Sequence, residues 1–153
     1  MKIVEAVAKD MNVVRELFRE YQVWLGIDLC FQDFEGELAS LPGRYAPPKG
    51  AIFLAVDDSR AVGCVAIRPR IDSEAELKRL YVRSSHRGYG HGTLLFDAAI
   101  RKAKAIGYTS IVLDTLPNMQ AAKSLYLAHG FKAIPAYYEN PEPGAEYYRC
   151  ALV

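Results

Sequence analysis

The segment 77–115 constrains the fold more than any other part of the chain. It begins with a strand-like run in which apolar residues alternate with charged ones, and it ends with TSIVLDT, whose centre is almost entirely apolar. Between the two runs lie three glycines at alternate positions and a helical pattern over residues 93–107 that stops at Gly107. A nearly all-apolar strand is typical of one covered on both faces. The segment therefore predicts a β-loop-α-β unit with a parallel crossover.

The rest of the chain supplies strands and helices around this unit. Apolar residues recur at helical spacing after Asp10, which we expect to cap the first helix, and a weaker pattern is interrupted by Gly36. The expected elements are a strand at 2–8, helices at 11–24 and 25–43, strands at 51–56, 61–69 and 73–83, a helix at 93–107, a strand at 109–115, a helix at 118–130 capped by Asn118, and strands at 131–137 and 146–153. We predict one domain, residues 1–153, with the order β-α-α-β-β-β-α-β-α-β-β.

The composition restricts the kind of protein and its partners. The chain has 153 residues, is 51% hydrophobic and has a formal net charge of +1. It is long enough to bury a core, and it has no global field that would attract nucleic acid or an anionic membrane. Its three cysteines are odd in number and far apart, which argues against a disulfide framework and a CxxC metal site. No apolar stretch approaches the roughly 20 residues that span a bilayer, and no signal-peptide run is present. We expect a cytoplasmic protein that binds neither nucleic acid nor membrane and holds no metal.

The glycines at 88, 90 and 92 stand directly before the predicted helix. Glycine lets the backbone approach a ligand closely, and successive N–H groups at a helix N-terminus bind phosphate oxygens. The spacing is GxGxG, so it matches neither the dinucleotide fingerprint nor the ATP-binding loop. A turn that needs glycine only for its shape is the alternative.

The residues around this loop resemble a known family. Arg87-x-x-Gly90-x-Gly92 follows the run ELKRLYV, and about 25 residues later comes a helix that begins near Asn118 and ends in Gly130-Phe131. Together these motifs resemble the GNAT superfamily of N-acetyltransferases, and the resemblance covers essentially the whole chain. It implies a single-domain α/β fold of the α+β kind, with a mixed, mostly antiparallel sheet around a central parallel β-α-β unit.

The resemblance also implies a reaction and its cofactor. A GNAT enzyme moves an acetyl group from acetyl-CoA to a primary amine by direct attack in a ternary complex, with acetyl-CoA as co-substrate. The loop would hold the pyrophosphate, and the backbone of the LYV strand would pair with the pantetheine arm. The expected cofactor-binding residues are Leu80, Tyr81, Val82, His86, Arg87, Gly88, Tyr89, Gly90, His91, Gly92, Thr93, Asn118 and Tyr126.

Two residues match the catalytic positions of the family. Tyr126 stands where a tyrosine faces the CoA sulfur, and its ordinary pKa near 10 makes it a hydrogen-bond donor to the leaving sulfur rather than a strong acid. Glu76 stands where many relatives carry the base that deprotonates the amine, directly or through water. Glu74 competes for this role from the same strand face. The alternatives are a packed tyrosine and ordinary solvated carboxylates.

The acceptor site is the least defined part of the prediction. The resemblance nominates Trp24, Phe31, Arg68 and Tyr137, with Asp28, Tyr138 and Asn140 as further wall residues. We expect a small-molecule amine or an amino acid as acceptor. Three alternatives remain open: a module that binds acetyl-CoA without catalysis, a protein N-acetyltransferase, and a toxin-antitoxin-like partner protein. A metal hydrolase built from His86, His91 and Asp97 fits poorly, because histidines five residues apart do not share a helix face. Dimers are common in the family, so the expected states include a homodimer.

Overall fold

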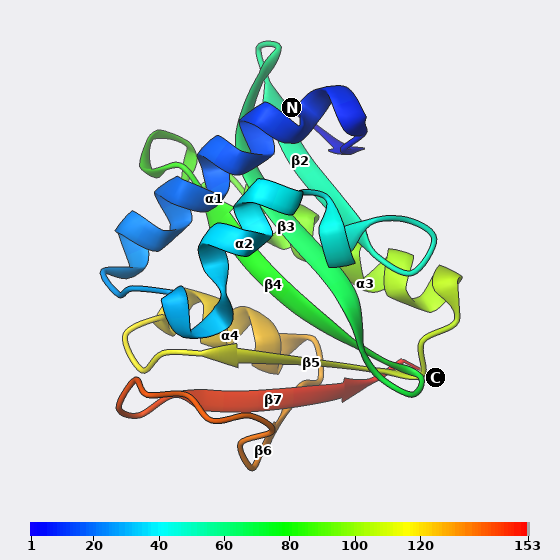
Figure 1. Ribbon diagram of the computed structural model, residues 1–153, viewed down its shortest axis with the longest axis vertical. Coiled ribbons are helices and arrows are strands. Elements are labelled where there is room, and N and C mark those ends of the chain that lie inside the picture. Colours follow the sequence, from blue (N-terminus) through cyan, green and yellow to red (C-terminus); the bar gives the residue numbers. More distant parts are fainter. Residues whose placement is uncertain (153) are drawn as a thin grey trace.

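A single sheet of seven strands, in the order β1-β2-β3-β4-β5-β7-β6, forms the centre of the molecule (Figure 1). The computed structural model describes residues 1–152, and of Phe31 it describes the backbone alone. The strands are β1 (Lys2–Glu5), β2 (Ala51–Asp57), β3 (Arg60–Ile71), β4 (Glu74–Val82), β5 (Ser110–Thr115), β6 (Lys132–Ile134) and β7 (Glu146–Ala151). β4 and β5 run parallel, and the other neighbouring pairs are antiparallel. The predicted element order and parallel crossover are confirmed.

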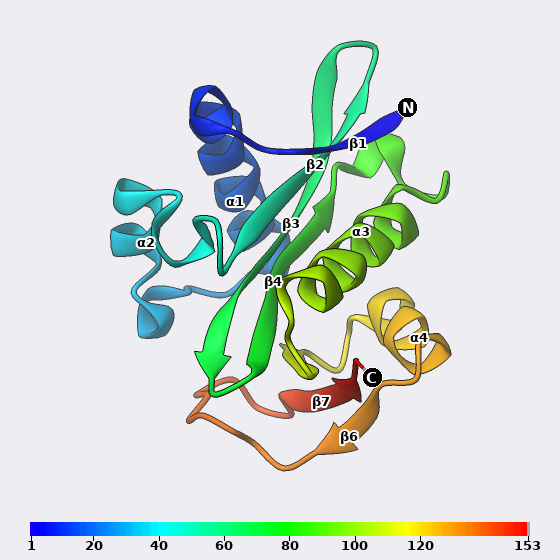
Figure 2. The same cartoon turned by 90° about the vertical axis from the view of Figure 1, so that its right-hand side faces the viewer.

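Helices cover both faces of the sheet. They are α1 (Met11–Leu25), α2 (Phe34–Ser40), α3 (His91–Ile106) and α4 (Gln120–Ala128). Figure 2 shows α1 and α2 on one face of the sheet, with α3 and α4 on the other. Each side has its own apolar cluster, one built around Leu17 and Phe18 of α1 and one around Leu95 and Phe96 of α3. Burial of these two faces is the main driving force for this layered arrangement.

The second helix is shorter than expected. The predicted span 25–43 contains α2 at its centre and two 3₁₀ turns, Cys30–Gln32 and Gly43–Tyr45. The chain leaves the helical conformation at Leu41, with ψ at 138°, because a proline at the next position disfavours the α region. Gly26, with φ at 74°, ends α1 at Leu25, the first residue of this span.

Three helix starts also differ from the prediction. The Asp10 carboxylate accepts a hydrogen bond from the Val7 N–H at 2.8 Å and closes the preceding 3₁₀ turn, so it does not cap α1. α3 begins at His91 rather than at residue 93, because Gly90 adopts the left-handed conformation that starts it. α4 starts after Met119, and the Asn118 side chain does not cap it.

A bulge in β4 separates it from β5. Cys64 pairs with Tyr81 and Ala66 pairs with Lys78, so β4 holds one extra residue at this point. Arg79 has a φ of 64°, which an L-residue adopts rarely. β4 pairs with β5 only over residues 74–76. The two parallel strands therefore diverge beyond Glu76 and leave one backbone edge of residues 77–82 without a strand partner among the described strands.

Within residues 1–152, no helix has the length and apolar character needed to cross a membrane.

Candidate active site

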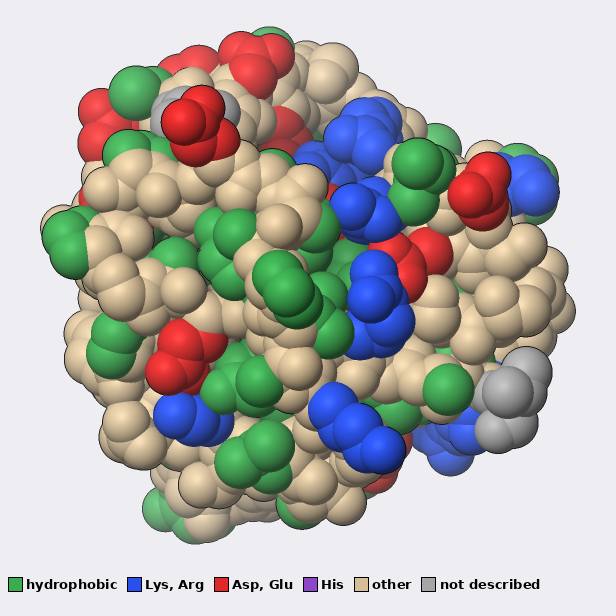
Figure 3. Space-filling view, turned by 90° about the horizontal axis from the view of Figure 1, so that it is seen from below, with side chains coloured by type: hydrophobic (Ala, Val, Ile, Leu, Met, Phe, Trp, Pro, Cys, Tyr) green, Lys and Arg blue, Asp and Glu red, His purple; other side chains and the backbone are tan. Residues whose placement is uncertain are grey.

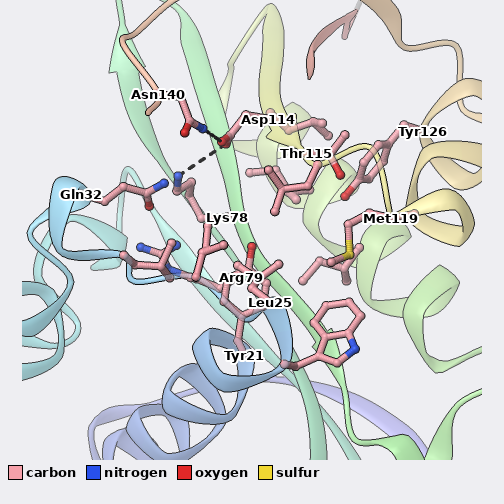
Figure 4. A pocket seen from close by; sticks show the side chains of 18 residues that line it. Tyr21, Leu25, Gln32, Lys78, Arg79, Asp114, Thr115, Met119, Tyr126 and Asn140 are labelled. Atoms are coloured by element: carbon pink, nitrogen blue, oxygen red, sulfur yellow. Dashed lines mark hydrogen bonds and ion pairs between the residues drawn. The ribbon is translucent and has the colours of Figure 1, made fainter. Parts of the chain in front are cut away.

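The gap between β4 and β5 opens into a pocket that reaches both faces of the sheet. Its walls come from α1, the segment after α1, β4, the end of β5 and α4, with one residue from the loop before β7 (Figure 4). The lining residues are Tyr21, Trp24, Leu25, Ile27, Leu29, Gln32, Leu77, Lys78, Arg79, Leu80, Leu113, Asp114, Thr115, Leu116, Met119, Ala122, Tyr126 and Asn140. Most of the wall is apolar, and four of its polar side chains, those of Gln32, Lys78, Asp114 and Asn140, gather at one end. This combination is typical of small-molecule sites.

Tyr126 lines the pocket from the α4 side. The residue is 5% exposed, and its ring packs against Phe96 and Phe131. Its hydroxyl is turned into the pocket (Figure 4), and no other described residue forms a hydrogen bond with it. Burial raises the pKa of this phenol, with smaller contributions from Tyr21 and Asp114. Tyr126 therefore keeps its proton and can donate a hydrogen bond to a group in the pocket.

The polar end of the pocket is organised by Tyr138. Its hydroxyl donates to Asp114 Oδ2 and accepts from Asn140 Nδ2 at 3.1 Å and from Gln32 Nε2 at 3.2 Å. Burial and the Asp114 carboxylate raise the pKa of Tyr138, so the hydroxyl remains a donor. The other amide atom of Gln32, Oε1, is buried and has no hydrogen-bond partner among the described residues.

Lys78 supplies the positive charge at this end. Its side chain is 4% exposed, and Nζ lies 3.6 Å from Asp114 Oδ1 and 3.9 Å from Glu76 Oε2. Burial lowers the pKa of this lysine, while Asp114 and Glu76 act in the opposite direction. Figure 4 shows Lys78, Asp114 and Asn140 close together, away from Tyr126.

Glu76 lies outside the pocket lining, inside a network of ion pairs. Its Oε1 accepts from Arg68 at 3.0 Å and its Oε2 accepts from the Tyr137 hydroxyl at 2.7 Å. Burial alone would raise the pKa of Glu76, but Lys78, Arg68 and the Tyr137 hydrogen bond outweigh it and hold the pKa below its ordinary value. Glu76 is therefore an ionised carboxylate that holds Arg68 and Tyr137 in place.

The network continues through α2. Glu37 forms a bidentate pair with Arg79, at 3.0 Å for both bonds, and lies 3.8 Å from Arg68. Arg79 is 2% exposed, and its guanidinium lies over the rings of Tyr21 and Phe34. These contacts hold the bulge of β4 against α1 and α2.

Glu74, the competing base, lies at the start of β4. It accepts hydrogen bonds from Arg70, Arg149 and Ser110. Burial alone would raise its pKa, but Arg149 and Ser110 hold it below its ordinary value. Glu74 does not line the pocket, so its contacts are those of a structural carboxylate.

The glycine loop exposes its backbone. Gly88 and Gly90 have φ values of 86° and 87°, and a Cβ added at either would meet nothing within 4 Å. Open space above a positive-φ backbone at the N-terminus of α3 fits the phosphate groups of coenzyme A, because the first N–H groups of a helix have no internal partner. The residues present therefore fit the group that the sequence motif implies.

The side chains of the loop divide into exposed and buried ones. Tyr89 is 73% exposed, and Thr93 is also exposed. His91 is buried between the rings of His86 and Tyr89, and neither of its ring nitrogens has a hydrogen-bond partner among the described residues. His91 can therefore offer a ligand its backbone N–H, and its ring serves packing.

Arg87 connects the loop to α1. Its Nε donates to the Val82 carbonyl at 2.8 Å, and its guanidinium lies 4.7 Å from the centre of the Trp24 ring. Tyr81 packs beside Trp24 and donates its hydroxyl to Glu20. Trp24 therefore lines the pocket and also packs against Arg87 of the glycine loop.

The sequence-predicted residues fall into clear groups. Trp24, Leu80 and Tyr126 line the pocket, whereas Arg68 and Tyr137 lie behind it, bonded to Glu76. Asn118 is exposed in the turn before α4. The side chain of Phe31 lies outside the described residues.

Lys78, Asp114, Gln32 and Arg79 line the pocket and were not nominated as functional by sequence reasoning. A charged residue inside the apolar strand IVLDT was the one available signal for Asp114. Of the wall residues added to the prediction, Asn140 lines the pocket, and Tyr138 bonds to Asp114.

The charges on one face of the molecule are mixed. On the face shown in Figure 3, basic side chains lie beside acidic ones, with hydrophobic side chains between them. Asp97 pairs with His129 at 2.7 Å rather than with either loop histidine. Among the described residues, no three His, Cys, Asp or Glu side chains gather in a way that could hold a metal ion.

Comparison with known proteins connects this geometry to a family. Residues 11–131 match the model of the Acetyltransferase (GNAT) family. An uncharacterized N-acetyltransferase of Schizosaccharomyces pombe is 41% identical over 146 residues, which cover 94% of this chain and 90% of the relative. A solved GNAT-family acetyltransferase from Staphylococcus aureus superposes with a TM-score of 0.81 at 21% identity, covering 99% of each chain. The PaiA N-acetyltransferase from Thermoplasma acidophilum, solved in complex with coenzyme A, superposes with a TM-score of 0.73 at 20% identity over 98% of each chain.

These similarities agree with the mixed, mostly antiparallel sheet and with the motifs on which the prediction rested. The chain belongs to the GNAT acetyltransferase family and is an acyl-CoA-dependent N-acetyltransferase.

Proposed function

We propose that the protein transfers the acetyl group of acetyl-CoA directly to a small-molecule primary amine, with both substrates bound at once. The observation that carries the proposal is the single pocket between the diverging β4 and β5, which has Tyr126 on one side and Asp114 on the other. Two substrates that enter from opposite faces of the sheet can meet there without a covalent enzyme intermediate.

The chain's own groups would bind the cofactor as follows. The backbone of residues 86–92 binds the pyrophosphate, with Arg87 held in place by Trp24. The free edge of β4 at residues 80–82 pairs with the pantetheine arm. The bound cofactor supplies an acetyl thioester, whose carbon–sulfur bond breaks as the amine nitrogen takes the acetyl group. The Tyr126 hydroxyl donates a hydrogen bond to the sulfur as negative charge develops there.

The amine must lose a proton before or during attack. Glu76 is our candidate to receive it through water, because it is ionised and its Oε2 lies 3.9 Å from Nζ of Lys78, a residue that lines the pocket. Asp114 is the second candidate, because it lines the pocket directly. The dependence of kcat/KM on pH tests which of the two carboxylates is the base. Glu76→Gln and Asp114→Asn should change the acidic limb of that profile to different extents.

The pocket favours a small acceptor over a protein chain. Its polar end is half-buried and lies between Gln32, Asp114 and Asn140, with Tyr138 behind them. A protein substrate would need an open groove for the residues on either side of its amine. The free Tyr126 hydroxyl also favours catalysis over a module that only binds acetyl-CoA.

The test is a set of initial rates, measured as release of free CoA thiol while both substrates are varied. Small amines and peptides with free N-termini serve as acceptors. We expect intersecting double-reciprocal lines with a small amine and no turnover of the peptides. Parallel lines would contradict direct transfer, and preferred turnover of peptides would contradict a small acceptor.

A further inference from the structure

The ammonium of Lys78 lies between two carboxylates but is hydrogen-bonded to neither. The residue is 5% exposed and lines the pocket. Its two nearest carboxylate oxygens, at 3.6 and 3.9 Å, lie beyond ordinary hydrogen-bond length. An ammonium carries three N–H donors, and no described residue accepts any of them here. The two carboxylates compensate its charge, and its N–H donors remain available to the oxygens of an anionic group in the pocket.

A buried acceptor without a donor lies at the same end of the pocket. Gln32 Oε1 has no partner among the described residues, although the amide nitrogen of the same side chain is held by Tyr138. Asp114 lines the pocket beside it. Oxygens of this kind accept hydrogen bonds from an amine or ammonium group.

The charged side chains around the polar end of the pocket are equal in number for the two signs. Three carboxylates, those of Glu37, Glu76 and Asp114, are paired with three cations, those of Arg68, Lys78 and Arg79. A ligand that brought only an ammonium, or only a carboxylate, would leave one buried charge without a counterpart. A ligand that brings both charges together keeps the balance.

From these observations we propose that the acceptor is an α-amino acid, and that Lys78 binds its carboxylate while Gln32 and Asp114 receive its amino group. Lys78 Nζ and Asp114 Oδ1 are 3.6 Å apart, which suits a carboxylate and an ammonium group attached to the same α-carbon. The rest of the pocket, with Leu25, Ile27 and Leu29, suits an apolar side chain. This assignment rests on the proposed function and makes Lys78 the residue that sets acceptor specificity.

The first test compares matched acceptors with the natural protein. L-Leucine, L-leucinamide and 3-methylbutylamine share a side chain and an amine, and only the first carries a carboxylate. Together with them we would assay the other common amino acids and their decarboxylated amines for CoA thiol release. A charge-assisted hydrogen bond predicts that amino acids exceed their carboxylate-free counterparts in kcat/KM by about 10- to 100-fold. Equal or better turnover of the carboxylate-free amines overturns the inference and leaves the proposed function standing. No turnover of either class overturns both.

The second test changes the acceptor specificity with a single substitution. Lys78→Met should reduce the preference for the amino acid over the matched amine to within about 3-fold, mainly through a higher KM for the amino acid. Lys104→Met, at an exposed position on α3, is the matched control and should keep the full preference. Lys78→Arg keeps the charge and should restore part of the preference, which separates recognition from misfolding. A preference that survives in Lys78→Met, with cofactor binding intact, overturns the assignment.

Discussion

At the scale of single residues, Tyr126 is the group whose role can be separated most cleanly from folding. Its ring packs in the apolar cluster on the α3 side, while its hydroxyl has no described partner and is turned into the pocket. Tyr126→Phe keeps the ring and removes the donor. We expect kcat to fall about 100-fold while the Kd for CoA stays within about 2-fold.

The control for this variant is Tyr108→Phe. Tyr108 is also buried, but its hydroxyl donates to the Lys49 carbonyl, away from the pocket. That variant should keep the natural kcat. Steady-state kinetics and calorimetric titration with CoA measure the two effects separately. Unchanged kcat in Tyr126→Phe would remove the tyrosine from the mechanism.

Glu76 gives a prediction about stability and pH. Its pKa in the folded protein lies below the ordinary value of 4.5, because its bonds to Arg68 and Tyr137 and the charge of Lys78 outweigh its burial. Its contribution to the free energy of unfolding is therefore fully present above pH 4.5 and is lost as the pH falls through the lower, folded-state pKa. Glu76→Gln should cost about 3 kcal/mol at pH 7, because it leaves Arg68 short of a partner in a buried network.

Urea unfolding of the natural protein and of Glu76→Gln measures this effect across pH. The difference between the two should be constant above pH 4.5 and should shrink below it, since a protonated glutamic acid resembles glutamine. Glu139→Gln, at an exposed position, should change stability by less than about 0.5 kcal/mol at every pH. A difference that does not depend on pH would show that the carboxylate charge contributes nothing to stability.

At the scale of elements, the glycine loop and α1 act as one unit through Arg87 and Trp24. The guanidinium lies 4.7 Å from the indole ring, and Trp24 is the only tryptophan in the chain. Binding of CoA phosphates at the loop should therefore change the tryptophan fluorescence. Arg87→Ala should raise the Kd for CoA about 10-fold, because the loop loses both a charge and its link to α1.

Fluorescence titration with CoA measures both effects of this prediction. Arg101→Ala, an exposed change of the same kind further along α3, should leave the Kd unchanged. A normal Kd in Arg87→Ala would mean that the loop binds phosphate through its backbone alone.

The type and order of the helices and strands were largely predictable from the sequence. The residues at which they begin and end were less predictable. The hydrophobic periodicity and the residues that end helices and strands predicted the order of the elements, and Gly107 ends α3 as expected. The span of α2 was overestimated, because the residues before it form a 3₁₀ turn and Pro42 ends the helix at its other side. The bulge at Arg79, which has a positive φ, had no local sequence signal, and the side chain there pairs with Glu37, 42 positions away in sequence.

At the scale of the whole molecule, the motifs predicted the cofactor side of the site better than the acceptor side. The loop and the tyrosine of α4 are local patterns at fixed spacing, so one sequence is enough to recognise them. The polar end of the pocket joins Gln32, Lys78, Asp114 and Asn140, each from a different element. Only the folded sheet, with β4 and β5 apart, brings these four together.

The most direct test of the account is a thermal unfolding series of the natural protein with acetyl-CoA, CoA, NADH and ATP. Each is added at about a hundredfold over its expected Kd, which corresponds to about 2.7 kcal/mol of stabilisation and a rise in Tm of roughly 5 to 10 °C. We expect this rise with acetyl-CoA and with CoA, and none of comparable size with NADH or ATP. No rise with the CoA compounds, or a larger one with NADH or ATP, would contradict the claim that the glycine loop and the gap between β4 and β5 hold acetyl-CoA.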